Sequence, residues 1–284
     1  MKSKVNVLVL YVRHGKEKYQ TALNRLRDFY ASFSYHLHYD LCIIENNTEL
    51  LFQNFERCSD HSVLSGDNSF REFSGWDKAL RHFAYDLKNY DFVHFVTSAF
   101  EMFYDGYLRH FHVDHFINAK SKNMCIGHVD FYPEQCVFLN TPFRSWVRSC
   151  FFFIPTSILN LLTPLTYITD FSKIFGETFL TPFLADTPLC KQYQAYLLNW
   201  ITGEGINGAQ WHSRFELTSD NFDFFKRKAI MIMNEQHLSI RMRNMKIQII
   251  DVGYSYTHQH VINYDSLPSM ESQAIERKKI VMDP

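Results

Sequence analysis

The side chains best suited to chemistry gather in the segment Gly66–Leu80, which has the sequence GDNSFREFSGWDKAL. Asp67 and Asn68 follow a turn signal, and Arg71 and Glu72 precede an expected helix N-terminus. Free backbone N–H groups at a helix N-terminus favour anions, and an arginine can bind a phosphate or carboxylate with two parallel hydrogen bonds. The segment therefore predicts a site for an anionic ligand. A helix cap with a surface salt bridge is the alternative interpretation.

The first half of the chain alternates strand-like and helix-like patterns. We expect strands and helices, in this order, at Val5–Val12, Lys16–Phe33, Asp40–Glu45, Gly75–Leu87 and Phe92–Thr97. This β-α-β-α-β order predicts an open, mostly parallel sheet with helices on both faces. Ligands bind such sheets beyond the carboxyl ends of the strands, here Tyr11–Gly15, Asn46–Asn47 and Thr97–Glu101.

The second half is expected to be largely helical. We predict helices at Tyr104–Phe116, Trp146–Leu162 (kinked or divided into two helices at Pro155), Leu189–Ile201 and Phe222–Arg243, the last capped by Thr218–Asp220. Strands are predicted at Met124–Val129 and Ile247–Val252. From His258 onward the chain is polar and unpatterned, which is typical of a loose tail or of an arm for a partner.

The segment around Arg71 also resembles a known motif. Asp67-Asn68 followed by Arg71-Glu72-Phe73-Ser74-Gly75-Trp76-Asp77 is similar to the N-x-G-x-x-x-E-F-G-G-W/Y motif of GT-A-type glycosyltransferases, notably those of bacterial O-antigen and rhamnan assembly. By strand order the resemblance extends over about residues 5–135. It implies one GT-A-like, Rossmann-like domain over residues 1–257, with a nucleotide-sugar-binding half (1–135), an acceptor-side, largely helical half (136–257) and a C-terminal tail (258–284).

The resemblance also implies roles for individual residues. The donor would contact Tyr11, Asn46, Asp67, Asn68, Arg71, Glu72, Gly75, Trp76, Asp77 and Ser98, with Asp77 orienting the loop. His128, Arg144 and Arg148 would lie on the acceptor or phosphate side. Inverting transfer needs a base, for which Asp130 is the candidate and Glu101 the reserve. A turn or cap aspartate and a half-buried histidine are the plainer interpretations of Asp130 and His128.

One departure from the family concerns the metal. The D-x-D motif expected after the third strand is replaced by Thr97–Glu101 (TSAFE), where only Glu101 offers a carboxylate. Either Mg²⁺ or Mn²⁺ is held weakly by Glu101 and the diphosphate, or the enzyme needs no metal. Metal independence is favoured, and it would require cations at the leaving group, for which Arg13, His14, Arg144 and Arg148 are available.

Composition excludes several other classes. With 29 basic and 30 acidic residues, the chain lacks the basic excess of a nucleic-acid binder. The six scattered cysteines and the absence of a signal-peptide pattern favour the cytoplasm. Cys150–Leu165 is broken by Pro155 and Pro164, which argues against a membrane span. The aromatic segment Phe138–Leu165 is consistent with core packing, and the basic C-terminal third with solvated helices. For both, contact with the inner face of the cytoplasmic membrane is the alternative.

We therefore expect transfer of a sugar from a nucleotide-diphosphate donor to a saccharide or lipid-linked saccharide acceptor in bacterial surface polysaccharide synthesis. A nucleotidyl- or methyltransferase is a second hypothesis, weakened because Val12–Lys16 lacks a glycine-rich phosphate loop. A non-catalytic scaffold that kept the fold but lost the metal motif is the third. A histidine-based metal site is disfavoured, since among His110, His112 and His115 only the last two could share a helix face.

Overall fold

The computed structural model describes residues 4–13, 19–47, 55–102, 105–206, 210–258 and 262–280. Its strands are β1 (Val5–Arg13), β2 (Leu37–Glu45), β3 (Phe55–Arg57), β4 (Ser62–Ser65), β5 (Phe92–Thr97), β6 (Cys125–Gly127), β7 (Val129–Phe138), β8 (Thr141–Val147), β9 (Phe151–Pro155) and β10 (Ile249–Asp251). Its α-helices are α1 (Ala22–Ser32), α2 (Arg71–His82), α3 (Val113–Lys122), α4 (Thr156–Leu162), α5 (Lys191–Thr202), α6 (Phe222–Asn244), α7 (Val252–Thr257) and α8 (Met270–Ile280).

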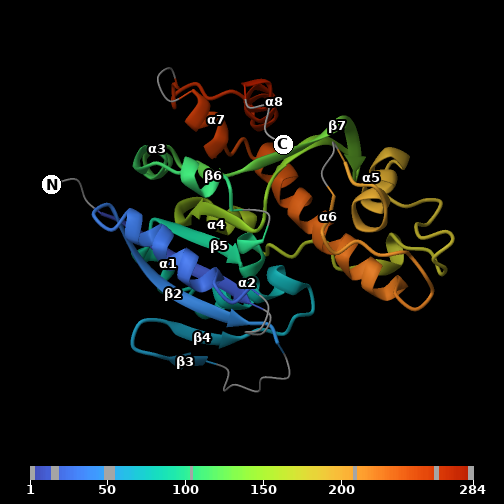
Figure 1. The fold of residues 1–284 in the computed structure, drawn as a ribbon, viewed down its shortest axis with the longest axis horizontal. Coiled ribbons are helices and arrows are strands. Elements are labelled where there is room, and N and C mark those ends of the chain that lie inside the picture. The colour runs from blue at the N-terminus through green and yellow to red at the C-terminus, as the bar shows by residue number, and fades with distance from the viewer. Residues whose placement is uncertain are drawn as a thin grey trace.

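The described residues form one eight-stranded sheet with the order β10-β6-β9-β5-β1-β2-β4-β3 (Figure 1). β1 pairs in parallel with both β2 and β5, whereas β9 runs antiparallel between β5 and β6. From β1 the chain moves to β2 on one side and later returns to β5 on the other. The predicted α/β class with a mostly parallel sheet is therefore confirmed, and β1 marks the switch point where such sheets bind ligands.

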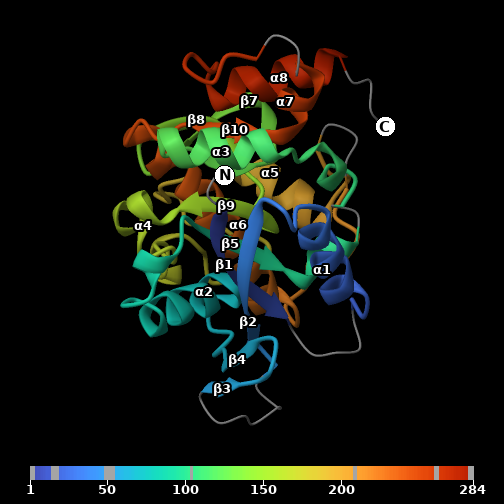
Figure 2. The same cartoon turned by 90° about the vertical axis from the view of Figure 1, so that its left-hand side faces the viewer.

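Alternate side chains of the central strands pack into two separate cores, because successive side chains of a strand point to opposite faces of the sheet. Val7, Val9 and Tyr11 of β1 pack in the core that includes residues of α1 and α3. Leu8 and Leu10 pack in the core that includes residues of α2, α4 and the end of α6. Figure 2 shows α1 and α2 on opposite sides of the sheet. Helices thus cover both faces, as predicted.

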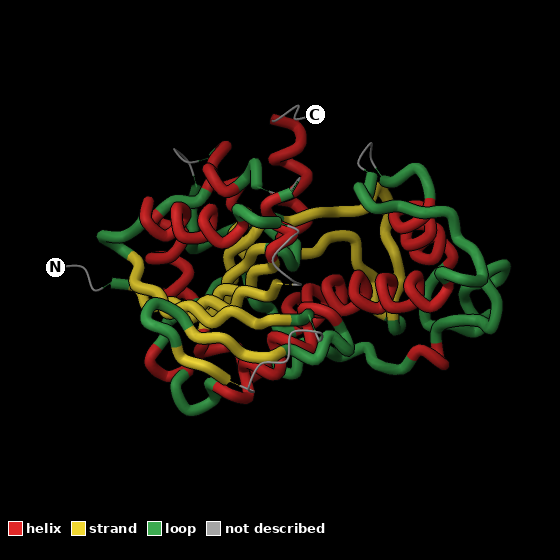
Figure 3. Tube along the Cα trace, turned by 60° about the horizontal axis from the view of Figure 1, so that its bottom comes forward, coloured by secondary structure: helices red, strands yellow, loops and turns green. Residues whose placement is uncertain are grey.

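A third core lies beyond the sheet, where the β7–β8 hairpin meets α5 and the first half of α6. Tyr132, Phe143, Tyr193 and Phe225 are buried there. The 23-residue helix α6 joins this core to the sheet, because its later residue Leu238 belongs to the core beneath α2. Figure 3 shows the strands of the sheet side by side, and further strands that extend away from them toward the helical part.

The helix predicted at Trp146–Leu162 forms only after Pro155, and the prediction is wrong for the part before it. This stretch contains the end of β8, all of β9 and then α4. Every residue of β9 is buried, since the strand lies between β5 and β6 with helices on both faces. A continuous apolar run carries no period that separates a central strand from a buried helix, and Pro155 ends the strand instead of kinking a helix.

Other boundaries differ as well, among them that of α3, which lies at Val113–Lys122 instead of the expected Tyr104–Phe116. α2 begins at Arg71, four residues before the expected start at Gly75. α6 follows Asn221, whose Oδ1 accepts the amide of Thr218 at 2.9 Å, so the expected cap by Thr218–Asp220 is replaced by this turn. The expected loose tail contains α8, which packs against the β7–β8 hairpin and β10. Among the described helices, none combines the length and the hydropathy needed to cross a bilayer.

Candidate functional site

The carboxyl ends of β1, β2 and β5 bring together residues from distant parts of the chain. Tyr11 is buried in β1 and its hydroxyl hydrogen-bonds to Ser98, directly after β5. Burial raises the pKa of Tyr11 above its usual value, so the ring stays neutral. Beside it, Nε of Arg13 donates to Oε2 of Glu45 at 2.6 Å. The predicted residues Tyr11 and Ser98 therefore meet at the switch point of the sheet.

Three predicted site residues leave polar atoms unsatisfied at this edge. Oδ1 of Asn46, Nε of Arg71 and Oε2 of Glu101 are buried and have no hydrogen-bond partner among the described residues. They come from the loop after β2, the first turn of α2 and the segment after β5. A buried polar atom without a partner costs about 1–3 kcal/mol, so their gathering at one edge points to a ligand site.

The start of α2 is tied to this edge. Nδ2 of Asn46 donates to the carbonyl of Arg71 at 2.9 Å, and Arg71 has a positive φ of 50°. The Arg71 guanidinium lies 5.2 Å from the ring centroid of Phe224, on α6. Burial raises the pKa of Glu72, against the opposing charge of Lys228. Arg71 and Glu72 thus lie where α2 approaches α6, beside the carboxyl edge of the sheet.

The exposed part of the motif forms a turn. Oδ1 of Asp67 accepts the amide of Ser69 at 3.0 Å, and Asn68 has a positive φ of 54°. Asp67 also borders an open surface cavity of about 650 Å³, lined further by Phe55, Leu64, Lys78, Arg81 and His82. This cavity lies over the outer face of α2 and the β3–β4 pair.

The last three residues of the motif have structural partners instead of facing a ligand. Trp76 is fully buried, and its Nε1–H donates to a carbonyl of β1 at 3.1 Å. A Cβ on Gly75 would lie 3.1 Å from the side chain of Ile44, a tight contact, so glycine at this position favours the close approach of α2 to β2. Asp77 accepts the amides of Leu165 and Thr166, at 2.7 and 2.9 Å. These residues hold α2 against the sheet and anchor the loop after α4.

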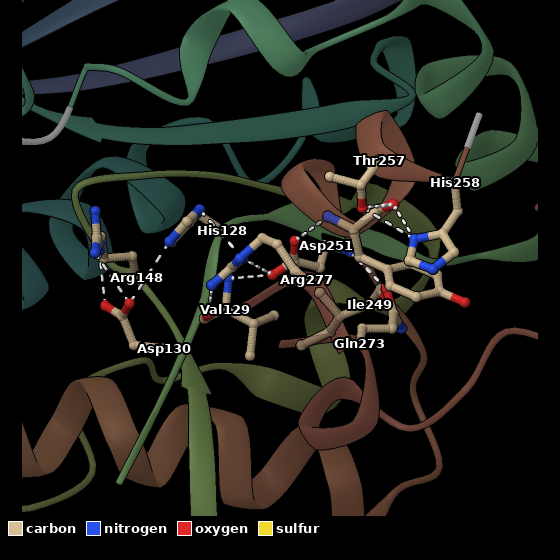
Figure 4. A network of polar contacts seen from close by, with 11 residues as sticks. His128, Val129, Asp130, Arg148, Ile249, Asp251, Thr257, His258, Gln273 and Arg277 are labelled. Atoms are coloured by element: carbon tan, nitrogen blue, oxygen red, sulfur yellow. Dashed lines mark hydrogen bonds and ion pairs between the residues drawn. The ribbon is translucent and has the colours of Figure 1, made fainter. Parts of the chain in front are cut away.

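Asp130 forms a bidentate ion pair with Arg148 (Figure 4). Nε and Nη2 of Arg148 lie 2.7 and 2.9 Å from the two carboxylate oxygens. Burial raises the pKa of Asp130, but the charge of Arg148 and the contact with His128 outweigh it and hold that pKa well below its usual range. An acid this strong is a poor proton acceptor at neutral pH, which argues against the predicted role of Asp130 as general base.

His128 lies next to this pair. Its Nε2 is 3.6 Å from Oδ1 of Asp130, and its ring stacks on Tyr107 with the centroids 4.6 Å apart. Burial and the positive charges of Arg148 and Arg277 lower the pKa of His128 to about 4, so the ring is neutral at pH 7.

Arg144 lies on the same hairpin but does not join Arg148. Its Nε donates to the carbonyl of Tyr132 at 2.8 Å, and its Nη1 lies 3.3 Å from Oε1 of Glu271 on α8. The predicted phosphate-side residue therefore fastens the hairpin to α8.

The sequence analysis missed Glu235, in the middle of α6. Its half-buried carboxylate accepts the amide of Ser149 at 2.6 Å, and the next carbonyl, that of Cys150, accepts the amide of Thr97 at the end of β5. Burial raises the pKa of Glu235 to about 7; the Ser149 hydrogen bonds lower it, and the charges of Asp130 and Glu72 raise it further. A carboxyl group with this pKa exchanges protons readily at neutral pH.

The metal predictions find limited support in the donor set. No group of three or more His, Cys, Asp or Glu side chains in the described part of the chain could hold a metal ion. His112 and His115 instead cap α3, because Nδ1 of His115 accepts the amide of His112 at 3.1 Å and Nδ1 of His112 accepts that of Asp114 at 3.3 Å. Glu101 remains the candidate ligand, with one carboxylate oxygen hydrogen-bonded by Thr21. His14, considered as a cation for the leaving group, lies outside the described residues.

The chain matches no known protein-family model, and a search of curated proteins finds no match either. Its function is therefore inferred from the residues of the site.

Proposed function

We propose that this protein is a glycosyltransferase that moves a sugar from a nucleotide-diphosphate donor to a saccharide or lipid-linked saccharide acceptor in bacterial surface polysaccharide synthesis. One observation carries the proposal: Glu235, a carboxyl group with a pKa of about 7, is in electrostatic contact with both Glu72 of the motif and Asp130 of the opposite hairpin. The charge of this proton acceptor therefore interacts both with the segment that resembles a donor site and with the side expected to hold the acceptor.

The donor fits the carboxyl edge of the sheet. Its diphosphate would lie at the N-terminus of α2, where backbone amides and the Arg71 guanidinium favour negative charge. Donor hydroxyl groups would satisfy Oδ1 of Asn46, which is buried and accepts no hydrogen bond from the described residues. Lys228 adds a positive charge close to Glu72. The carboxyl end of β1, where the strand order of the sheet reverses, lies in the middle of this edge, and such switch points are where ligands bind.

The transfer would be a single displacement. An acceptor hydroxyl attacks the anomeric carbon while Glu235 takes the hydroxyl proton, and the bond between that carbon and the phosphate oxygen breaks with its electron pair going to the diphosphate. General base catalysis of this kind contributes about 10²–10⁴-fold to a rate. Asp130, ionised and fixed by Arg148, would orient the acceptor and would keep the pKa of Glu235 high.

A divalent cation can be accommodated but is not required by these residues. Oε2 of Glu101 is a buried carboxylate oxygen without a hydrogen-bond partner among the described residues, and Mg²⁺ or Mn²⁺ prefers such oxygen ligands. Glu101 would hold the ion together with the diphosphate, and the ion would neutralise the charge of the leaving group. Without it, Arg71 and Lys228 would supply that neutralisation.

Ligand binding by the purified full-length chain tests the proposal. Melting temperatures would be recorded with UDP, GDP and dTDP species, their sugar conjugates and S-adenosylmethionine, each with EDTA or Mn²⁺, and donor hydrolysis would be followed in parallel. A ligand that binds only the native state at 100 times its Kd stabilises by about 2.7 kcal/mol. Stabilisation and hydrolysis by one nucleotide-sugar class support the transferase. Stabilisation by S-adenosylmethionine alone, or binding without turnover on any acceptor, would contradict it and favour a methyltransferase or a scaffold.

A further inference from the structure

Arg277 reaches the candidate site from α8, near the C-terminal end of the described chain (Figure 4). Its Nη2 donates to the carbonyl of Val129 at 2.7 Å, and its Nη1 pairs with Oδ2 of Asp251. The same Nη1 lies 3.4 Å from Nδ1 of His128. One guanidinium therefore connects α8, the end of β10 and the start of β7.

The surrounding structure is built to hold this guanidinium. Asp251 is fully buried, and its carboxylate also accepts the amides of Val129 at 2.8 Å and Tyr254 at 2.7 Å. The amide of Asp251 donates to Gln273 of α8 at 2.9 Å, which fixes α8 at a second point. A Cβ at position 253 would lie 2.5 Å from Cδ of Arg277, so Gly253 leaves the space through which the side chain passes.

The contact with His128 has a chemical consequence. A guanidinium carries only donors, so the nitrogen that faces it must accept. A neutral imidazole has one donor and one acceptor nitrogen, and Nδ1 as acceptor leaves the proton on Nε2. That nitrogen lies 3.6 Å from Oδ1 of Asp130. The side chains that face the ring are Arg277 on one nitrogen, Asp130 on the other, Tyr107 stacked on its plane, and Arg148 beyond Asp130.

We infer that Arg277 is a positioning residue that fixes His128 in its Nε2–H tautomer and directs this N–H toward Asp130. The ring N–H then faces Oδ1 of Asp130, the same oxygen that accepts a hydrogen bond from Nη2 of Arg148. The helix that carries Arg277 thereby determines the state of a site more than 100 residues earlier in the chain. The consequence for catalysis rests on the proposed function, whereas the tautomer does not.

Nitrogen NMR of the histidine side chains at pH 7 tests this inference on the full chain, with the His128 signals assigned by a His128→Gln variant. In the wild type, Nδ1 should give the signal of an unprotonated nitrogen and Nε2 that of a protonated one. Arg277→Gln offers an amide that can either donate or accept, so both His128 tautomers should appear. Arg277→Lys keeps a donor-only group and should restore the single tautomer. Lys279→Gln, an exposed charge change on the same helix, should leave the His128 signals unchanged.

Because Arg277→Gln leaves Asp251 without its partner, that variant can fail to fold. Gly253→Ala provides a second perturbation, since its Cβ displaces the Arg277 side chain without removing the charge, and it too should produce mixed tautomers. A wild-type Nδ1–H tautomer would overturn the inference, as would a single Nε2–H tautomer that persists in a folded Arg277→Gln or Gly253→Ala variant. Nucleotide binding measured on the same samples is a separate readout, so failure of the proposed function and failure of this inference can be told apart.

Discussion

The backbone amide of Ser149 donates to Oε1 of Glu235 over 2.6 Å, which ties the middle of α6 to the turn between β8 and β9. This hydrogen bond holds the carboxyl group in place and lowers its pKa, yet burial and the charges of Asp130 and Glu72 outweigh it. The result is a fixed carboxyl group that is half protonated near pH 7. Asp130, by contrast, is fixed by Arg148 and stays ionised. Two nearby carboxylates with such different pKa values are typical of a division between proton acceptor and charge stabiliser.

Glu235→Gln should abolish the proton acceptor while preserving the hydrogen bond, because the amide oxygen of glutamine can still accept from Ser149. We expect sugar transfer to fall about 10²–10⁴-fold with little change in donor affinity. Initial rates of transfer, together with donor Kd values, measure both effects. Glu177→Gln, at an exposed position, is the matched control. Wild-type transfer by Glu235→Gln would show that the base is elsewhere.

The same variant should change how stability depends on pH. The pKa of Glu235 is about 7 in the folded protein against 4.5 ordinarily, so between these values the native state keeps a proton that the unfolded chain has released. The stability contributed by this group is therefore complete below pH 4.5 and declines as the pH rises toward 7. Glu235→Gln removes that decline, so its stability relative to wild type should increase from pH 5 to pH 8. Urea unfolding at both pH values measures it. An unchanged difference would indicate an unperturbed carboxyl group.

The central sheet could be predicted because its strands are short, apolar on both faces and separated by helices. β5 was predicted at its observed bounds, Phe92–Thr97, and β1 differs by one residue. The β7–β8 hairpin could not be predicted in this way. Its inner residues face a separate core formed by α5 and α6, and β9 is paired with strands distant in sequence. Local periodicity does not contain those contacts.

Sequence reasoning could bring residues together at the carboxyl edge of the sheet, but it could not foresee which side chains are used for packing. Asn46, Arg71 and Glu101 all have unsatisfied polar atoms at the carboxyl edge. Trp76, in contrast, is a core residue that packs edge-to-face against Phe95 and Phe152 of the sheet. Glu235 was missed because its importance depends on tertiary contacts. The available signal was the polar run Asn234–His237, which lies directly between the apolar run Ala229–Met233 and Leu238.

Removal of Arg148 should lower the free energy of unfolding, because the charge of Asp130 is then no longer neutralised. Arg148→Met leaves the partly buried Asp130 without its bidentate partner, which should destabilise the fold by about 3 kcal/mol. Asp130→Asn added to Arg148→Met should recover most of that loss, because no uncompensated charge remains. Urea unfolding of the single and double variants gives the coupling energy. A loss of less than about 0.5 kcal/mol in Arg148→Met would mean that the pair behaves as an ordinary surface ion pair.

Stability should fall on acidification below pH 6.5. Burial, together with the charge of His112, lowers the pKa of His115 to about 3, and burial together with Arg148 and Arg277 lowers that of His128 to about 4. The unfolded chain therefore binds protons that the native state rejects between these values and 6.5, so stability decreases as the pH falls through this window. Each histidine contributes up to about 1.4 kcal/mol per pH unit, and Glu235, whose contribution has the opposite sign in this window, offsets one of the two, so a net fall is expected. Melting temperatures from pH 7 to pH 4.5 measure the trend, and His115→Gln should reduce its slope. A slope that His115→Gln leaves unchanged would remove this residue from the explanation.

Gly66→Ala should weaken donor binding at the carboxyl edge of the sheet, although residue 66 is not expected to contact the ligand. A Cβ at this position would lie 1.9 Å from Oδ1 of Asn46, so the amide must move and its 2.9 Å hydrogen bond to the carbonyl of Arg71 must break. The start of α2 then loses its attachment to the loop after β2, and we expect nucleotide affinity to fall at least about tenfold, or 1.4 kcal/mol. Gly106→Ala is the matched control, because among the described residues no atom outside its chain neighbours lies within 4 Å of the added Cβ. Calorimetric titration of both variants with the nucleotide that stabilises the wild type measures the effect. Equal affinities in the two variants would place the nucleotide away from Asn46 and the first turn of α2.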